Sequence, residues 1–79
     1  MNKYQDEVFL DTLEGLMEHF NTNSRTKVVG LKEVAIATGL SRRTIERNRE
    51  KYGFGNVGGL WGKETTLVRI ARAMSREVR

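Results

Sequence analysis

The first part of the chain has an amphipathic pattern. Across residues 4–20 the apolar side chains recur at intervals of three and four, while the acidic residues occupy the other face. The apolar set is Phe9, Leu13, Leu16, Met17 and Phe20, with Leu10 beside them. This spacing puts the apolar side chains on one face of a helix. We therefore predict an amphipathic helix over 4–20 that packs on the core, with part of its face as an alternative surface for a dimer or another protein.

Two shorter helical patterns follow in residues 31–51. In the first, Val34, Ala35 and Thr38 share one face, and Gly39 then interrupts the periodicity. Glycine adopts the left-handed conformation that commonly ends a helix. The pattern predicts a short helix that ends in a tight turn, and Lys27-Val28-Val29 before it predicts a very short strand.

The second pattern begins at Ser41, whose hydroxyl can accept hydrogen bonds from the free N–H groups of a first helical turn. Ile45 is the apolar residue that turns this helix inward, and we expect Leu40 and Ile45 to fill the angle between the two helices. A small residue, a glycine turn and apolar plugs in this order are typical of a helix-turn-helix. The alternative is an ordinary helical hairpin that only packs.

A glycine-rich segment follows the second helix. Gly58-Gly59 stands between two apolar pairs, Phe54/Val57 and Leu60/Trp61. Two consecutive glycines suit a two-residue hairpin turn, which requires positive φ angles. We predict a small β-hairpin over 53–62, because a flexible linker rarely contains Phe and Trp. A phosphate-binding loop is a weaker alternative, since the GxxxxGK[ST] spacing is missing.

The last segment, 64–78, is predicted to be a helix. Its apolar stripe consists of Leu67, Ile70, Ala71, Met74 and Val78. Arginines recur on the opposite face at intervals of three and four, at Arg69, Arg72, Arg76 and Arg79. Such a row is either a solvated face or a surface that can lie along a phosphate backbone.

Charge is distributed unevenly along the chain. Residues 1–23 contain one lysine and five acidic residues, a formal charge of −4; since the whole chain carries +4, the remainder carries +8. A basic module of this kind is typical of a protein that binds a polyanion. A basic surface kept for solubility is the alternative.

Composition narrows the function classes. The 79 residues are enough for a single domain, residues 1–79, whose small core would gain from a dimer interface. The chain has no Cys, and His19 is its only histidine, so we expect no metal site. We found no paired carboxylates and no nucleophile–base pair, so we expect neither an enzyme nor a cofactor. No apolar run resembles a membrane span or signal peptide, so we expect a cytoplasmic protein, associated with the nucleoid or, if phage-encoded, in the host cytoplasm.

In a helix-turn-helix the start of the second helix faces the major groove. The residues predicted to read bases are therefore Ser41, Arg42, Arg43, Glu46 and Arg47. Arg43 and Arg47 are four residues apart and are the strongest candidates, since arginine binds guanine through two parallel hydrogen bonds. Glu46 would accept from cytosine or pair with Arg42. Phosphate contacts are predicted for Thr44, Arg49, Lys63, Arg69, Arg72 and Arg76.

From Val28 onward the chain resembles the small winged-helix DNA-binding modules of the AlpA-like, excisionase and MerR-like group. The resemblance rests on Leu31-Lys-Glu-Val-Ala, on Thr38-Gly-Leu-Ser-Arg-Arg-Thr-Ile, on Gly58-Gly-Leu-Trp and on the closing helix. The chain differs in having Asn48 where the group usually has a bulky apolar residue, in lacking proline and in its acidic first helix. The resemblance implies a mostly α, winged-helix-like fold.

The resemblance also implies a function, because such proteins are typically regulators in phages or mobile elements. They act as transcription factors or as directionality factors of site-specific recombination, and some small terminase subunits use a similar module. We therefore expect sequence-specific binding to double-stranded DNA, as a homodimer or cooperative oligomer. The alternatives are a terminase-like packaging subunit and a protein-interaction module, an antirepressor or adaptor, that binds its partner through the acidic first helix.

Overall fold

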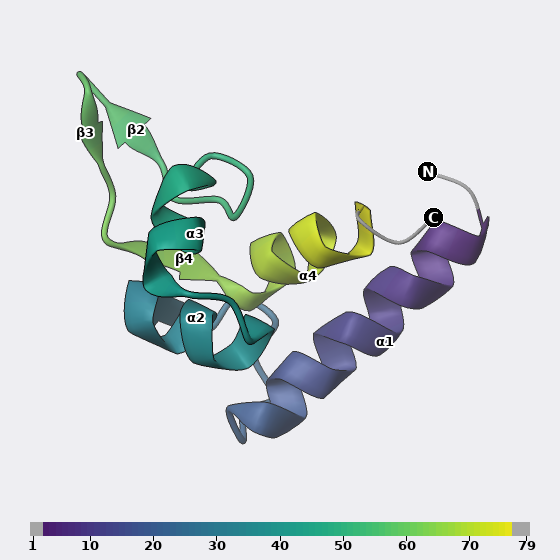
Figure 1. Cartoon of the computed structure of the whole chain (residues 1–79). Helices are drawn as coiled ribbons and strands as arrows, with labels where there is room; N and C mark the ends of the chain where they lie inside the picture. Colours follow the sequence, from purple (N-terminus) through teal and green to yellow (C-terminus); the bar gives the residue numbers. More distant parts are fainter. Residues whose placement is uncertain (1–2, 77–79) are drawn as a thin grey trace.

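The computed structural model describes residues 3–76 and has a mostly α architecture (Figure 1). Its elements, in chain order, are α1 (Lys3–His19), β1 (Val28–Gly30), α2 (Leu31–Thr38), α3 (Arg42–Arg47), β2 (Asn56–Val57), β3 (Leu60–Trp61), β4 (Glu64–Thr66) and α4 (Leu67–Arg76). The strands form two separate two-stranded antiparallel pairs, β1–β4 and β2–β3. Within residues 3–76, no helix has both the length and the apolar character needed to cross a membrane.

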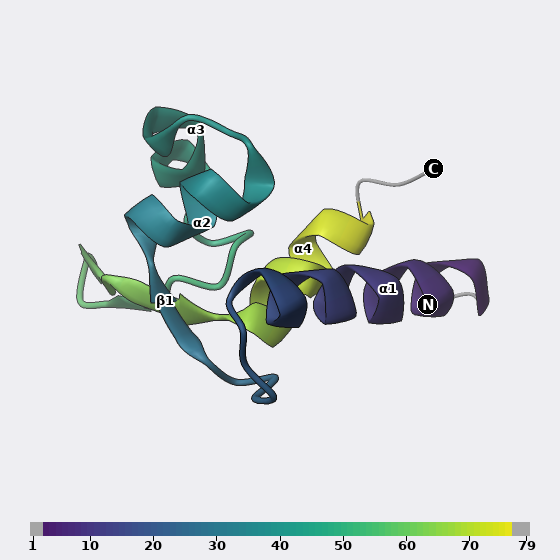
Figure 2. The same ribbon diagram turned by 90° about the horizontal axis from the view of Figure 1, so that it is seen from below.

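The predicted first helix is present as α1, and it packs against α4, the last helix (Figures 1 and 2). Leu13 and Leu16 are buried in the core, and Phe9, Met17 and Phe20 pack against its edge. This agrees with the predicted apolar face. Leu10 is 48% exposed and lies at the margin of that face.

The predicted last helix was wrong at its start. Residues 64–66 form β4, which pairs with β1 in the register Val28↔Thr66, Val29↔Thr65 and Gly30↔Glu64. Thr65 and Thr66 are β-branched and therefore favour a strand over a first helical turn. The helix begins instead at Leu67, and the predicted stripe residue Val78 and the arginine at 79 lie outside the described residues.

Helices α2 and α3 and the tight turn between them are present, but α3 ends at Arg47 and does not reach residue 51 as predicted, because Asn48 caps it and donates its side-chain N–H to the Thr44 carbonyl. Gly39 has a φ of 76° and its N–H donates to the Ala35 carbonyl, which ends α2. Val34 and Ile45 are completely buried in the shared core. Leu40 does not fill the angle between the helices, as we had expected: its side chain is 38% exposed, because the turn leads it outward and Ile45 already closes the contact.

The chain between α3 and the hairpin is held tightly to α4 and β4. Tyr52 and Phe54 are buried, although the sequence pattern did not single out Tyr52 as a core residue. Gly53 lies between them with a φ of 84°. A Cβ atom added there would come within 2.7 Å of both Arg69 and Thr65, so this close approach requires glycine.

The hairpin β2–β3 extends away from the helices at one end of the molecule (Figure 1). Asn56 pairs with Trp61 and Val57 with Leu60, which agrees with the hairpin predicted over 53–62. Gly58 and Gly59 form the turn with φ angles of 61° and 84°. Both values lie in the left-handed region that a two-residue hairpin turn of the primed type requires.

Candidate nucleic-acid interface

Helix α3 exposes one face that carries most of the predicted base-reading residues. Ile45 anchors the helix with no exposed surface. The positions on the other side of the helix are exposed to solvent and are occupied by Arg42, Arg43, Glu46 and Arg47. The helix therefore presents three arginines and one glutamate outward from a rigid attachment.

The start of α3 is fixed by a hydroxyl pair. The Ser41 Oγ atom accepts a hydrogen bond from the Thr44 backbone N–H at 3.1 Å, and the two hydroxyl oxygens lie 2.8 Å apart. These contacts satisfy a free N–H group of the first turn. Ser41 and Thr44, predicted as base and phosphate contacts, thus already serve as the cap that orients the arginines.

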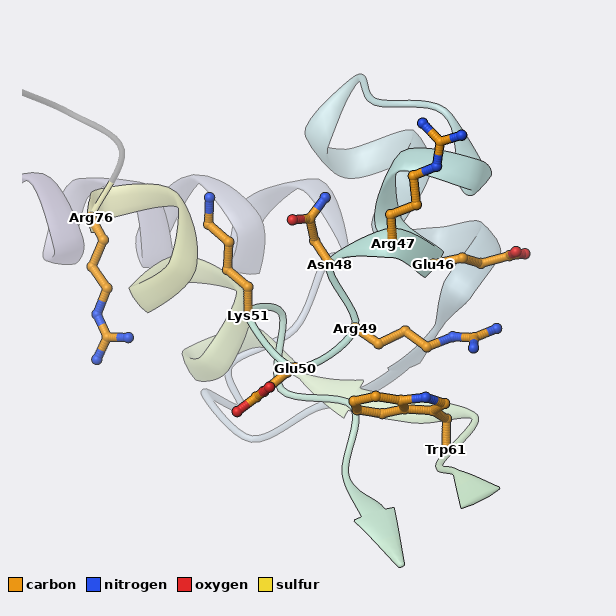
Figure 3. Close-up of a pocket in the computed structure, with 8 residues that line it drawn as sticks. All are labelled: Glu46, Arg47, Asn48, Arg49, Glu50, Lys51, Trp61 and Arg76. Atoms are coloured by element: carbon orange, nitrogen blue, oxygen red, sulfur yellow. The ribbon is translucent and has the colours of Figure 1, made fainter. Parts of the chain in front are cut away.

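Glu46 and Arg42 do not form an ion pair within α3. Among residues 3–76, no ion pair joins these two side chains, although their i,i+4 spacing permits one. In Figure 3 the side chains of Glu46 and Arg47 both extend outward from the helix. The predicted pairing of Glu46 with Arg42 is therefore not formed in this structure, and the Glu46 carboxylate is exposed to solvent.

A concave surface with only basic charge lies between α3 and the hairpin. This hollow of about 400 Å³ is lined by three cationic side chains, Arg42, Arg49 and Lys63, and by three apolar ones, Leu31, Phe54 and Trp61. No acidic residue lines it. We call this surface the basic notch. It brings together three predicted contact residues that are up to 21 positions apart in the sequence.

A second, open hollow of about 560 Å³ continues past the end of α3 (Figure 3). Its cationic residues are Arg47, Arg49, Lys51 and Arg76, and its acidic residues are Glu46 and Glu50. Arg49 and Trp61 line this hollow as well as the basic notch, and in Figure 3 the Arg49 side chain extends above the Trp61 ring. The two hollows therefore form one continuous surface with Trp61 at the junction.

The arginines of α4 do not share a single environment. The Arg69 guanidinium donates a 3.1 Å hydrogen bond to the Gly53 carbonyl, which ties α4 to the turn after α3. The Arg72 guanidinium carbon lies 5.4 Å from the centre of the Phe9 ring, within the range of a cation–π contact with α1. Arg76 lines the hollow beyond α3. Arg69 also lines a hollow beside the hairpin that shares Glu50 and Trp61 with this one, whereas Arg72 lies at α1.

Helix α1 carries a cluster of acidic residues. All five acidic residues of α1 are exposed: Asp6, Glu7, Asp11, Glu14 and Glu18. In both views α1 lies away from the hairpin (Figures 1 and 2), and no residue of α1 lines the basic notch. A polyanion would be attracted to the α3 and hairpin side and repelled by α1.

Sequence reasoning missed Trp61 and Phe54 as parts of this surface. Trp61 is 37% exposed and contributes to every hollow described above, whereas Phe54 is nearly buried and forms the floor of the basic notch. The sequence did contain a signal for Trp61. It lies two residues before Lys63, in a glycine-rich segment that has few side chains to cover its ring.

Within residues 3–76, no three His, Cys, Asp or Glu side chains gather in a way that could hold a metal ion. Comparisons of the chain with protein-family models, with curated proteins and with solved structures give no match.

Proposed function

We propose that this protein binds double-stranded DNA in a sequence-specific manner, with α2 and α3 as a helix-turn-helix and the hairpin β2–β3 as its wing. The observation that carries the proposal is the basic notch beside the exposed arginine face of α3. A recognition helix requires side chains that reach base edges, and an adjoining cationic surface that binds phosphate. The exposed arginines of α3 and the neighbouring cationic hollow support this proposal.

Each group has a separate role in this proposal. Arg43 and Arg47 enter the major groove and donate paired hydrogen bonds to guanine, while Glu46 accepts from cytosine. Arg42, Arg49 and Lys63 hold a backbone phosphate in the basic notch. Arg76 adds a phosphate contact at the far end of the surface. Phosphate contacts orient the protein on the duplex without specifying its sequence.

One copy of such a short helix reads only a few base pairs and buries little surface. Tight specific binding then calls for two or more copies on adjacent sites. We propose a homodimer or a cooperative array on DNA, and the resemblance of the sequence extends the proposal to a regulator or recombination directionality factor. Sedimentation with and without DNA at micromolar concentration tests the assembly, which a monomer bound tightly to one short site would contradict.

The test of DNA reading compares a preferred duplex, selected by the full chain from random sequences, with an unselected duplex. Arg43→Ala and Arg47→Ala should each weaken binding to the preferred duplex by roughly 5- to 150-fold, which corresponds to about 1–3 kcal/mol. Binding to the unselected duplex should fall much less.

The matched control is Arg25→Ala. This exposed arginine belongs to the loop between α1 and β1, which lies far from α3 and the hairpin in both views. It should bind both duplexes like the wild type. If the wild-type chain bound no duplex at low salt, or if the Arg43 and Arg47 variants bound both duplexes normally, the proposal would be wrong, and an interaction with a protein would replace it.

A further inference from the structure

The hairpin carries exposed apolar side chains where a phosphate-binding wing would carry cations. Residues 53–62 contain no charged residue, although 30% of the chain is charged. Leu60, which follows the turn directly, is 78% exposed, the highest value among the large exposed apolar residues. Leu60 and the partly exposed Trp61 beside it thus place two large apolar side chains on a projecting, uncharged element, where they are available to an apolar partner.

The hairpin holds this leucine in a defined position. The Gly59 N–H donates a 3.1 Å hydrogen bond to the Asn56 side-chain oxygen, which closes the turn. At the base of the hairpin, the Gly62 N–H donates to the Gly55 carbonyl at 2.6 Å. Together with the pairing of Asn56 with Trp61, these bonds fix both ends of the element.

The location of the hairpin indicates the nature of the partner. Trp61, the neighbour of Leu60, lines the basic notch together with Arg42 and Lys63. If the notch holds a backbone phosphate, as in the proposed function on which this inference rests, the hairpin must lie against the same duplex. The stacked faces of base pairs are an apolar surface of that duplex, and apolar side chains of DNA-binding proteins reach them from the minor groove.

We propose that Leu60 is a wedge that enters the minor groove next to the site read by α3 and partly unstacks one base step. Apolar wedges of this type kink DNA by about 20–90°. The ligand is thus a deformable duplex, with a pyrimidine–purine step such as TA or CA at the position of the wedge, because these steps unstack most easily.

The test uses the full chain and the preferred duplex with fluorophores at both ends, so that energy transfer reports bending and anisotropy reports binding. The wild-type protein should bring the DNA ends closer together. Leu60→Ala should abolish most of this change while binding weakens by less than about tenfold. Leu60→Phe, which retains a large apolar group, should preserve the bend.

The matched control is Ile36→Ala, which removes an apolar side chain that is 62% exposed on α2. It should leave both signals unchanged. A second probe, 2-aminopurine placed in the flexible step, should brighten with the wild type and not with Leu60→Ala, because its fluorescence is quenched by stacking.

The outcomes separate the wedge from the proposed function. A wild-type protein that binds the duplex without bending it, or a Leu60→Ala variant that bends it normally, overturns the wedge and leaves DNA binding intact. A wild-type dimer that Leu60→Ala converts to a monomer without DNA also overturns the wedge, since the leucine then serves a second copy. Failure of every variant to bind any duplex overturns both proposals.

Discussion

The Thr65 hydroxyl donates a 2.6 Å hydrogen bond to the carbonyl oxygen of Tyr52, and both residues are buried. The bond joins strand β4 to the turn that follows α3. The next residue, Thr66, also has a buried hydroxyl, but this one makes no hydrogen bond to any other described residue. The buried hydroxyl of Thr65 therefore stabilises the fold, whereas the buried hydroxyl of Thr66 costs free energy.

The first prediction follows from this contrast. Thr65→Val should lower the free energy of unfolding by about 1–3 kcal/mol, because the buried hydrogen bond from the Thr65 hydroxyl to the Tyr52 carbonyl is lost. Thr66→Val should leave that free energy unchanged or raise it, because a buried hydroxyl without a partner is replaced by a methyl group. Urea unfolding followed by circular dichroism measures both, and equal losses in the two variants would contradict the assignment.

The second prediction concerns Gly53. Alanine at this position would have a positive φ and a Cβ atom 2.6 Å from the Cδ atom of Arg69, so Gly53→Ala should destabilise the fold by more than about 2 kcal/mol. Gly39→Ala is the matched control, because Gly39 has a similar φ of 76° with nothing within 4 Å of the added atom. Gly39→Ala should lower the free energy of unfolding by only about 1–2 kcal/mol, the cost of placing an alanine at positive φ. Similar thermal unfolding of the two variants would mean that Gly53 is not tightly enclosed.

The third prediction compares two isoleucines in neighbouring helices. Ile45 has no exposed surface, so Ile45→Ala should cost about 2–5 kcal/mol and largely unfold a domain of this size. Ile36 is 62% exposed, so Ile36→Ala should unfold at nearly the temperature of the wild type. Thermal melts of both proteins check this, and an Ile45→Ala variant as stable as the wild type would refute the packing of α3 on α2.

The fourth prediction concerns the salt dependence of the proposed DNA binding. The logarithm of the binding constant falls linearly with the logarithm of the salt concentration. Removal of one phosphate-binding cation from the basic notch should make this decline shallower by about one unit of slope, on selected and unselected duplexes alike. We expect this for Arg42→Ala, Arg49→Ala and Lys63→Ala, measured by anisotropy from low to moderate salt. Arg25→Ala should keep the slope of the wild type, and an unchanged slope in all three notch variants would exclude the notch as a phosphate site.

Local patterns were sufficient to predict the helices, the cap and the hairpin turn. Ser41, Gly39 and the Gly58-Gly59 pair act through their own neighbours, so their structural roles can be recognised in a few consecutive residues. Strand β4 was mistaken for helix because its partner, β1, lies more than 30 residues earlier in the chain. A strand of three residues is too short to show a periodic pattern. The only local signal for β4 was its two β-branched threonines.

The candidate site was likewise predictable from the sequence only in part. The exposed arginine face of α3 could be predicted from helical spacing after Ser41. The basic notch could not, because it forms only when the β1–β4 pairing brings Lys63 back beside α2 and α3. The position of Trp61 between Arg49 and Lys63 likewise depends on the path of the hairpin and not on its sequence pattern.

The packing of α1 against α4 has a consequence for biosynthesis. The apolar face of α1 is made first, but its partner helix begins only at Leu67, roughly 50 residues later. At a translation rate of about 5–20 residues per second, the ribosome needs about 2–10 s to reach it. During that interval Leu13 and Leu16 have no α4 to cover them, so the apolar face of this amphipathic segment is available to a chaperone before the domain closes.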